Sequence, residues 1–161
     1  ILSVVSFLQD FGQKCRMAIV GCAPDLPQKL RNTIEVFPFL DKKTETGRKK
    51  FEELLFRSHF LLHLAKADCT PMVIGEANSF GIPAITSDVG GLPSLIKEGY
   101  NGKMFSFLEK PEIIGQYLIS IFREKNKYEN LAGKSATFAG DHFDWKKSCR
   151  LLLEFAFCKF F

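Results

Sequence analysis

The sequence alternates short apolar segments with longer amphipathic ones, and this alternation limits the fold more than any other feature. The short segments have the length and composition of buried strands; they are residues 17–21, 33–37, 59–64, 82–86 and 103–105. The connections between them are too long for β-hairpins, and most of them have helical periodicity. We therefore predict parallel βαβ crossovers, which build an α/β domain around a doubly wound, mostly parallel sheet.

The helical segments complete this prediction. They are residues 1–13, 49–57, 70–80, 92–97, 111–124, 126–138 and 145–158. Gly12 and Gly81 close two of them, as glycine does at a helix C-terminus. The 161 residues contain no internal repeat and no Gly/Ser linker, so we expect one domain with a helical tail.

The charge balance argues against a nucleic-acid partner. Lys+Arg 22 against Asp+Glu 18 gives a net charge of +4, and the basic residues are scattered along the chain. The five cysteines form no CxxC pair, which disfavours a disulfide framework and a zinc ribbon and favours a reducing, cytoplasmic setting. No apolar run approaches the roughly 20 residues that cross a bilayer, and the first residues are typical of an amphipathic helix rather than a signal peptide.

The segment from residue 67 to residue 85 carries the clearest chemical signal. Thr70 is a suitable N-cap, and Pro71 suits the first helical position, where its missing N–H is no loss. The helix thus begins at the carboxyl end of the third strand, where ligands bind in open α/β sheets. The free N–H groups of Met72 and Val73, with the positive end of the helix dipole, predict an anion site.

Two acidic residues flank this predicted anion site. Asp68 precedes the helix, and Glu76 lies inside it, roughly 7 Å along the axis from the first turn. An elongated ligand with a central diphosphate and hydroxyl-bearing rings at both ends matches this layout, because a carboxylate accepts two hydroxyls at once. Nucleotide sugars have that layout. The alternative is an ordinary helix start with two solvated acids.

The same segment resembles a known family. An acid, seven residues, Glu-Ala, and then Phe-Gly-Ile-Pro-Ala-Ile-Thr-Ser-Asp-Val-Gly-Gly-Leu-Pro is similar to the retaining glycosyltransferases of family 4, also called group 1. The resemblance covers residues 14–105, and Asp141-His142-Phe143-Asp144-Trp145 looks like the start of the family's closing helix at 145–158. It implies one lobe of the two-lobed GT-B fold, which is Rossmann-like, and specifically the C-terminal, donor-binding lobe.

The resemblance also implies roles for individual residues. Glu76 would hold the ribose hydroxyls, and Asp68 would approach the transferred sugar as the one catalytic candidate. Residues 70–73 would meet the diphosphate and sugar through backbone groups. Leu40, with its two neighbours, would flank the nucleobase. The donor would be a nucleoside diphosphate hexose, with no metal and no other cofactor. The resemblance does not identify the molecule that carries the acceptor hydroxyl.

The sequence departs from the family in three respects. The first acid is Asp68 where the family has Glu, and Cys69-Thr70-Pro71 replaces the usual Gly-Phe-Gly. The Arg and Lys that clamp the diphosphate, the first, central strand of the lobe and the whole acceptor lobe would all precede residue 1. We therefore expect residues 1–161 to be a single nucleotide-sugar-binding domain that lacks these parts and is inactive by itself.

Several alternative interpretations of the sequence stay open. A non-catalytic α/β binding or signalling module and a lobe of a sugar-nucleotide epimerase are the alternative functions. Residues 42–43 and 48–50 are basic and form either a solvated face or a contact with the inner membrane surface. Cys69 is expected to be a buried filler, His59 and His63 to be core or edge residues, and Gly90-Gly91 to be a tight turn.

Overall fold

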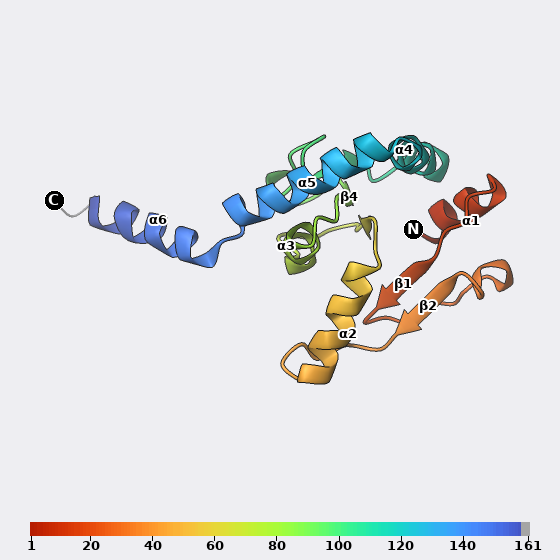
Figure 1. Ribbon diagram of the computed structural model, residues 1–161, viewed down its shortest axis with the longest axis horizontal. Coiled ribbons are helices and arrows are strands. Elements are labelled where there is room, and N and C mark those ends of the chain that lie inside the picture. Colours follow the sequence, from red (N-terminus) through yellow and green to blue (C-terminus); the bar gives the residue numbers. More distant parts are fainter. Residues whose placement is uncertain (159–161) are drawn as a thin grey trace.

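All the strands of the domain run parallel. The computed structural model describes residues 1–158 (Figure 1). Its strands are β1 (Met17–Val20), β2 (Ile34–Phe37), β3 (Leu61–His63), β4 (Ala84–Ser87) and β5 (Gly102–Phe105). β1 pairs with β2, and β4 lies between β3 and β5, with parallel register in each case. The predicted parallel α/β architecture is therefore confirmed.

The helices follow the predicted segments with some changes in length. They are α1 (Leu2–Asp10), α2 (Glu45–Phe56), α3 (Met72–Ser79), α4 (Pro111–Arg123), α5 (Lys125–His142) and α6 (Trp145–Cys158). Two 3-10 turns, η1 (Gln28–Leu30) and η2 (Leu92–Ser94), complete the list. The predicted helix 92–97 is wrong, because only the short η2 forms there. Helix α5 runs past the predicted end at residue 138, since burial of Phe138 and Ala139 outweighs the small cost of the glycine that follows.

Helices cover both faces of the strands, as a doubly wound fold requires. Ala84 and Ile85 are adjacent in β4 and fully buried. Ala84 packs with Ile74 of α3, whereas Ile85 packs with Val4 of α1 and with α4 residues. Because successive strand residues point to opposite faces, α3 lies on one side of β4, and α1 and α4 lie on the other.

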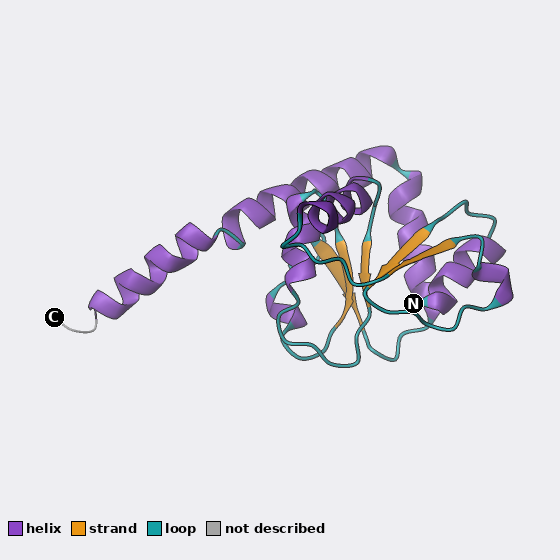
Figure 2. Ribbon diagram, turned by 90° about the horizontal axis from the view of Figure 1, so that it is seen from below, coloured by secondary structure: helices purple, strands orange, loops and turns teal. Residues whose placement is uncertain are grey.

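The strands form two separate sheets within the described residues. One holds β1 and β2, and the other holds β3, β4 and β5. Figure 2 shows the two groups of strands splaying apart. The sequence analysis expects a further central strand before residue 1, and no strand of the described residues joins the two sheets. The doubly wound arrangement is thus confirmed, but the single continuous sheet is not seen.

Helix α6 projects away from the body of the domain (Figures 1 and 2). Asp144 caps its start, because the Lys146 amide donates to Asp144 Oδ1 at 2.9 Å. Leu151, Leu152 and Leu153 are all more than half exposed. The predicted helix is therefore present, but these side chains do not close against the described body. Among residues 1–158, no helix is both long and apolar enough to cross a membrane.

Candidate functional site

Helix α3 begins at the carboxyl end of β3 without a side-chain cap. Pro71, in extended backbone (φ −66°, ψ 118°), occupies the N-cap, and no side-chain hydrogen bond closes the first turn. The prediction that Thr70 is the N-cap and Pro71 the first helical residue is therefore wrong by one position. Proline has no polar side-chain atom, so it leaves the Met72 and Val73 amides without an intramolecular cap. The Met72 side chain is 78% exposed, so this helix end faces outward.

Glu76 of α3 makes an ion pair with the loop that follows β2. Its side chain is partly buried and contacts Lys42 Nζ, which also lies 4.8 Å from the centroid of the Phe51 ring. This contact brings the loop that contains Leu40, itself half-buried, to the side of α3. The sequence analysis considered Lys42 only as a lipid-facing or solvated base, and the signal for a site role was its place in the loop that follows a strand.

Asp68 is held by a residue for which the sequence analysis assigned no functional role. Its Oδ2 lies 2.9 Å from Nε2 of His63, the last residue of β3, and both side chains are partly buried. His63 thus lies on an edge strand, as one of the two predicted alternatives has it, and it is also paired with Asp68. The sequence signal for a role of His63 in the site was its place at the carboxyl end of a parallel strand, where ligands bind in such sheets.

Gly90 and Gly91 let the chain after β4 approach the loop that carries Asp68. Gly90 has φ +57°, which favours glycine, and the Gly91 amide donates to the Asp68 carbonyl at 3.0 Å. A β-carbon on Gly91 would stand 2.1 Å from the Cys69 carbonyl oxygen. The predicted turn is confirmed, and it also positions the Asp68 loop. Cys69 itself is exposed, so the buried-filler prediction is wrong.

A buried amide pair anchors the far end of α3. Asn78 and Asn101 are fully buried, and Asn101 Nδ2 donates to Asn78 Oδ1 at 2.8 Å. Asn78 Nδ2 in turn donates to the Ile82 and Asn101 carbonyls at 2.9 and 3.2 Å. These bonds join α3 to the residue that precedes β5, and so they fix the direction in which the start of α3 points.

The site thus combines three groups around one helix end. Uncapped amides and the helix dipole favour an anion. The carboxylates of Asp68 and Glu76 are hydrogen-bond acceptors, which suits hydroxyl groups. The His63 and Lys42 contacts use part of that acceptor capacity and leave further lone pairs on each carboxylate. The donor-binding roles of residues 68–76 and of Leu40 stay predictions.

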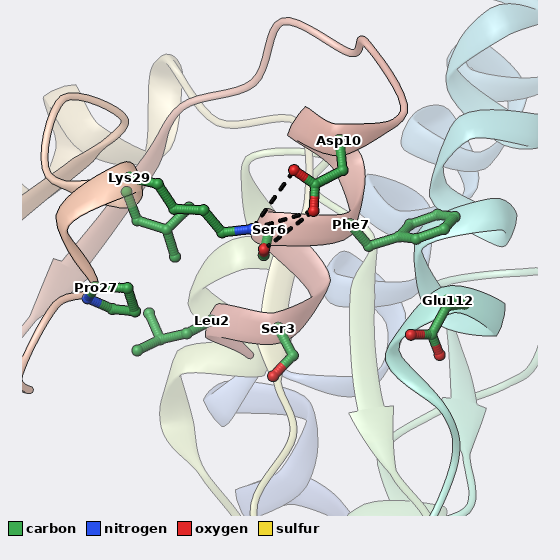
Figure 3. Close-up of a pocket in the computed structure, with 9 residues that line it drawn as sticks. Leu2, Ser3, Ser6, Phe7, Asp10, Pro27, Lys29 and Glu112 are labelled. Carbon is green, nitrogen blue, oxygen red and sulfur yellow. Dashed lines mark hydrogen bonds and ion pairs between the residues drawn. The ribbon is translucent and has the colours of Figure 1, made fainter.

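A well-defined hollow lies elsewhere, between α1, η1 and the start of α4 (Figure 3). It has a volume of about 330 Å³, and Lys29 crosses its edge to bind Asp10 at 3.1 Å. None of the predicted donor residues lines it. Within the described part of the chain, no three His, Cys, Asp or Glu side chains gather as a metal site. The expectation that the protein uses no metal stays a prediction.

Solved structures share this fold at low sequence identity. Sucrose-phosphate synthase from Thermosynechococcus elongatus superposes with a TM-score of 0.75 at 14% identity, over 98% of this chain and 42% of that chain. HepE of Anabaena, in complex with UDP and glucose, gives 0.68 at 14% identity, over 96% and 52%. WaaG, a glycosyltransferase of lipopolysaccharide biosynthesis, gives 0.54 at 18% identity, over 86% and 46%. The chain therefore has the fold of one lobe of the GT-B glycosyltransferases.

Sequence comparison gives the family. Spore coat protein SA of Bacillus subtilis (strain 168) is 33% identical over 78 residues, which are 48% of this chain and 21% of that protein. The chain thus spans about half the length of the similar structures and a smaller share of this relative. A family model described as "Glycosyl transferases group 1" matches residues 1–137. The fold and this match agree, and the chain belongs to the glycosyl transferases of group 1.

Proposed function

We propose that this chain is the donor-binding lobe of a retaining glycosyltransferase, which transfers a hexosyl group from a nucleoside diphosphate sugar to an acceptor hydroxyl. The observation that carries the proposal is the uncapped start of α3 between two partly buried carboxylates, Asp68 and Glu76. Similar structures are solved in complex with UDP, with UDP and glucose, and with UDP-glucose, which supports this ligand class.

The proposed mechanism rests on positioning and on stabilisation of the leaving diphosphate. The Met72 and Val73 amides donate to diphosphate oxygens, where negative charge develops as the glycosidic bond breaks. Glu76 accepts ribose hydroxyls while it stays paired with Lys42, and Leu40 flanks the nucleobase. Asp68 accepts hydroxyls of the transferred hexose and so fixes its orientation. The helix end supplies positive potential, so the proposal requires no metal.

The remaining parts of the proposal concern the whole protein. An acceptor-binding lobe and a further central strand of this lobe would complete the enzyme, which we place in the cytoplasm with the inner membrane surface as a peripheral contact. Residues 1–161 alone are expected to bind the donor without transferring it. Turnover by these residues at a rate typical of whole enzymes would contradict this part.

Isothermal titration of residues 1–161 with UDP, GDP and ADP tests the nucleotide site. Glu76→Ala removes the proposed ribose contact, which should cost about 1.5–3 kcal/mol in binding, or roughly 10- to 150-fold in Kd. Glu52→Ala is the matched control, since Glu52 is an α2 carboxylate whose nearest cation is Arg48, 3.8 Å away. Equal affinity of wild type and Glu76→Ala, at any level, would contradict the ribose assignment.

A further inference from the structure

His63 lies where β3 ends and where the candidate site begins. It pairs in register with Thr86 of β4, and residues paired across parallel strands point to the same face. Leu61, two residues earlier in β3, packs on the face that α3 covers. The side chain of His63 therefore points to the α3 side of the sheet, toward the loop that carries Asp68.

The contact between His63 and Asp68 has the geometry of a hydrogen bond. Nε2 lies 2.9 Å from Oδ2, and the two side chains are 23% and 32% exposed. An imidazole N–H that donates to a carboxylate makes a charge-assisted bond, which is stronger than a neutral one. The bond uses one carboxylate oxygen and leaves Oδ1 to accept from another donor.

The loop that carries Asp68 is already fixed by the last residue of β4 and by the chain after it. The Gly91 amide donates to the Asp68 carbonyl at 3.0 Å, and the Ser87 hydroxyl donates to the Ala65 carbonyl at 2.5 Å. A β-carbon on Gly90 would stand 2.0 Å from the Asp68 carbonyl oxygen, so the two segments are in close contact. Asp68 can then still rotate about its side-chain torsions, and the hydrogen bond to His63 restricts that rotation.

We infer that His63 is a positioning residue, which aims the free oxygen of Asp68 at the sugar end of the donor. The inference rests on the proposed function and adds to it a residue that acts on the hexose through Asp68 and not on the nucleotide. Loss of His63 therefore weakens binding of the sugar-bearing donor more than binding of the bare nucleotide. A side chain with a hydrogen-bond donor at the place of Nε2 restores binding of the sugar-bearing donor.

The experiment measures the affinities of residues 1–161 for UDP-glucose and for UDP. In His63→Leu the ratio of UDP-glucose affinity to UDP affinity falls about tenfold, the effect of one lost bond to a charged group. His63→Gln, whose amide nitrogen occupies the place of Nε2, recovers most of the ratio. His59→Leu is the matched control, because His59 packs against Phe122 and Tyr128, before the start of β3.

A second measurement needs no ligand. Long-range ¹H–¹⁵N spectra of the free protein report which ring nitrogen of His63 carries the proton, and Asp68→Ala shifts these signals if the bond exists. Unchanged ring signals overturn the inference even where His63→Leu fails to fold. An unchanged affinity ratio in a folded His63→Leu also overturns it and leaves the proposed function standing. Failure of the wild type to bind any of UDP, GDP, ADP and UDP-glucose overturns the proposed function, and this inference falls with it.

Discussion

The buried pair of Asn78 and Asn101 predicts a measurable coupling free energy. Asn78→Ala removes three hydrogen bonds: two that its Nδ2 donates to the Ile82 and Asn101 carbonyls, and one that its Oδ1 accepts. Asn101→Ala also removes three, since its side chain donates to Asn78 and Leu95 and accepts from the Lys97 amide. At about 1 kcal/mol for each bond, each variant should lose about 3 kcal/mol of unfolding free energy.

The double variant should lose less than the sum of the two single variants. The bond from Asn101 Nδ2 to Asn78 Oδ1 is counted in both single variants but is lost only once in the double variant. We therefore expect a loss of about 5 kcal/mol rather than 6, and a coupling free energy of about 1 kcal/mol.

Urea unfolding followed by circular dichroism gives the four free energies of this cycle. Asn130→Ala is a suitable control, because Asn130 is exposed on α5 and its replacement should change stability by less than about 0.5 kcal/mol. Losses that add to within about 0.3 kcal/mol would refute the reasoning, because independent sites add to that precision. The bonded pair would then not anchor α3 in solution.

Three further predictions concern stability. Gly91→Ala should lower the free energy of unfolding by about 1–3 kcal/mol, because the new β-carbon would stand 2.1 Å from a backbone oxygen. Gly133→Ala, whose β-carbon would have nothing within 4 Å, should instead raise it by about 0.5–1 kcal/mol. Equal effects of the two variants in urea unfolding would contradict this prediction. Thr86→Val should stabilise by about 1 kcal/mol, since the buried Thr86 hydroxyl has no hydrogen-bond partner in the described part of the chain; a lower melting temperature would count against it. The hydrogen bond from Lys103 lowers the pKa of Glu98 below its usual 4.5. The stabilisation that ionised Glu98 gives the fold is therefore present above pH 4.5 and is lost as the pH falls through the lowered pKa. Glu98→Gln should flatten the dependence of unfolding free energy on pH in this acidic range, and an unchanged slope would disprove the prediction.

The order and type of the main elements were predictable from the sequence because their causes are local. Strand-length apolar segments and glycine at the end of α3 act within a few residues of chain. The placement of α3 as the next element after β3 follows from the same pattern. Because the carboxyl edge of a parallel sheet is a general ligand position, the acids that flank this helix were also found as candidates.

The contacts of those acids were not predictable. Lys42 and Glu76 are 34 residues apart, and nothing in either local sequence selects the other. His63 and Asp68 are close in sequence, but their contact depends on how the loop folds back against Gly90 and Gly91. Thr70 is a good N-cap by type, yet the extended backbone of Pro71 moved the cap by one residue. In each case a side chain had alternatives of similar local energy, and packing chose among them.

The sequence by itself thus determined the parallel α/β class, the helix that begins after β3 and the acids on either side of its start. Only the tertiary structure decided the partners of those acids, the division of the strands into two sheets, and the outward direction of α6. The physical reason is one of range. Backbone propensity and hydrophobic period act over a few residues, whereas ion pairs, strand partners and helix docking depend on which surfaces the folded chain brings within a few ångströms.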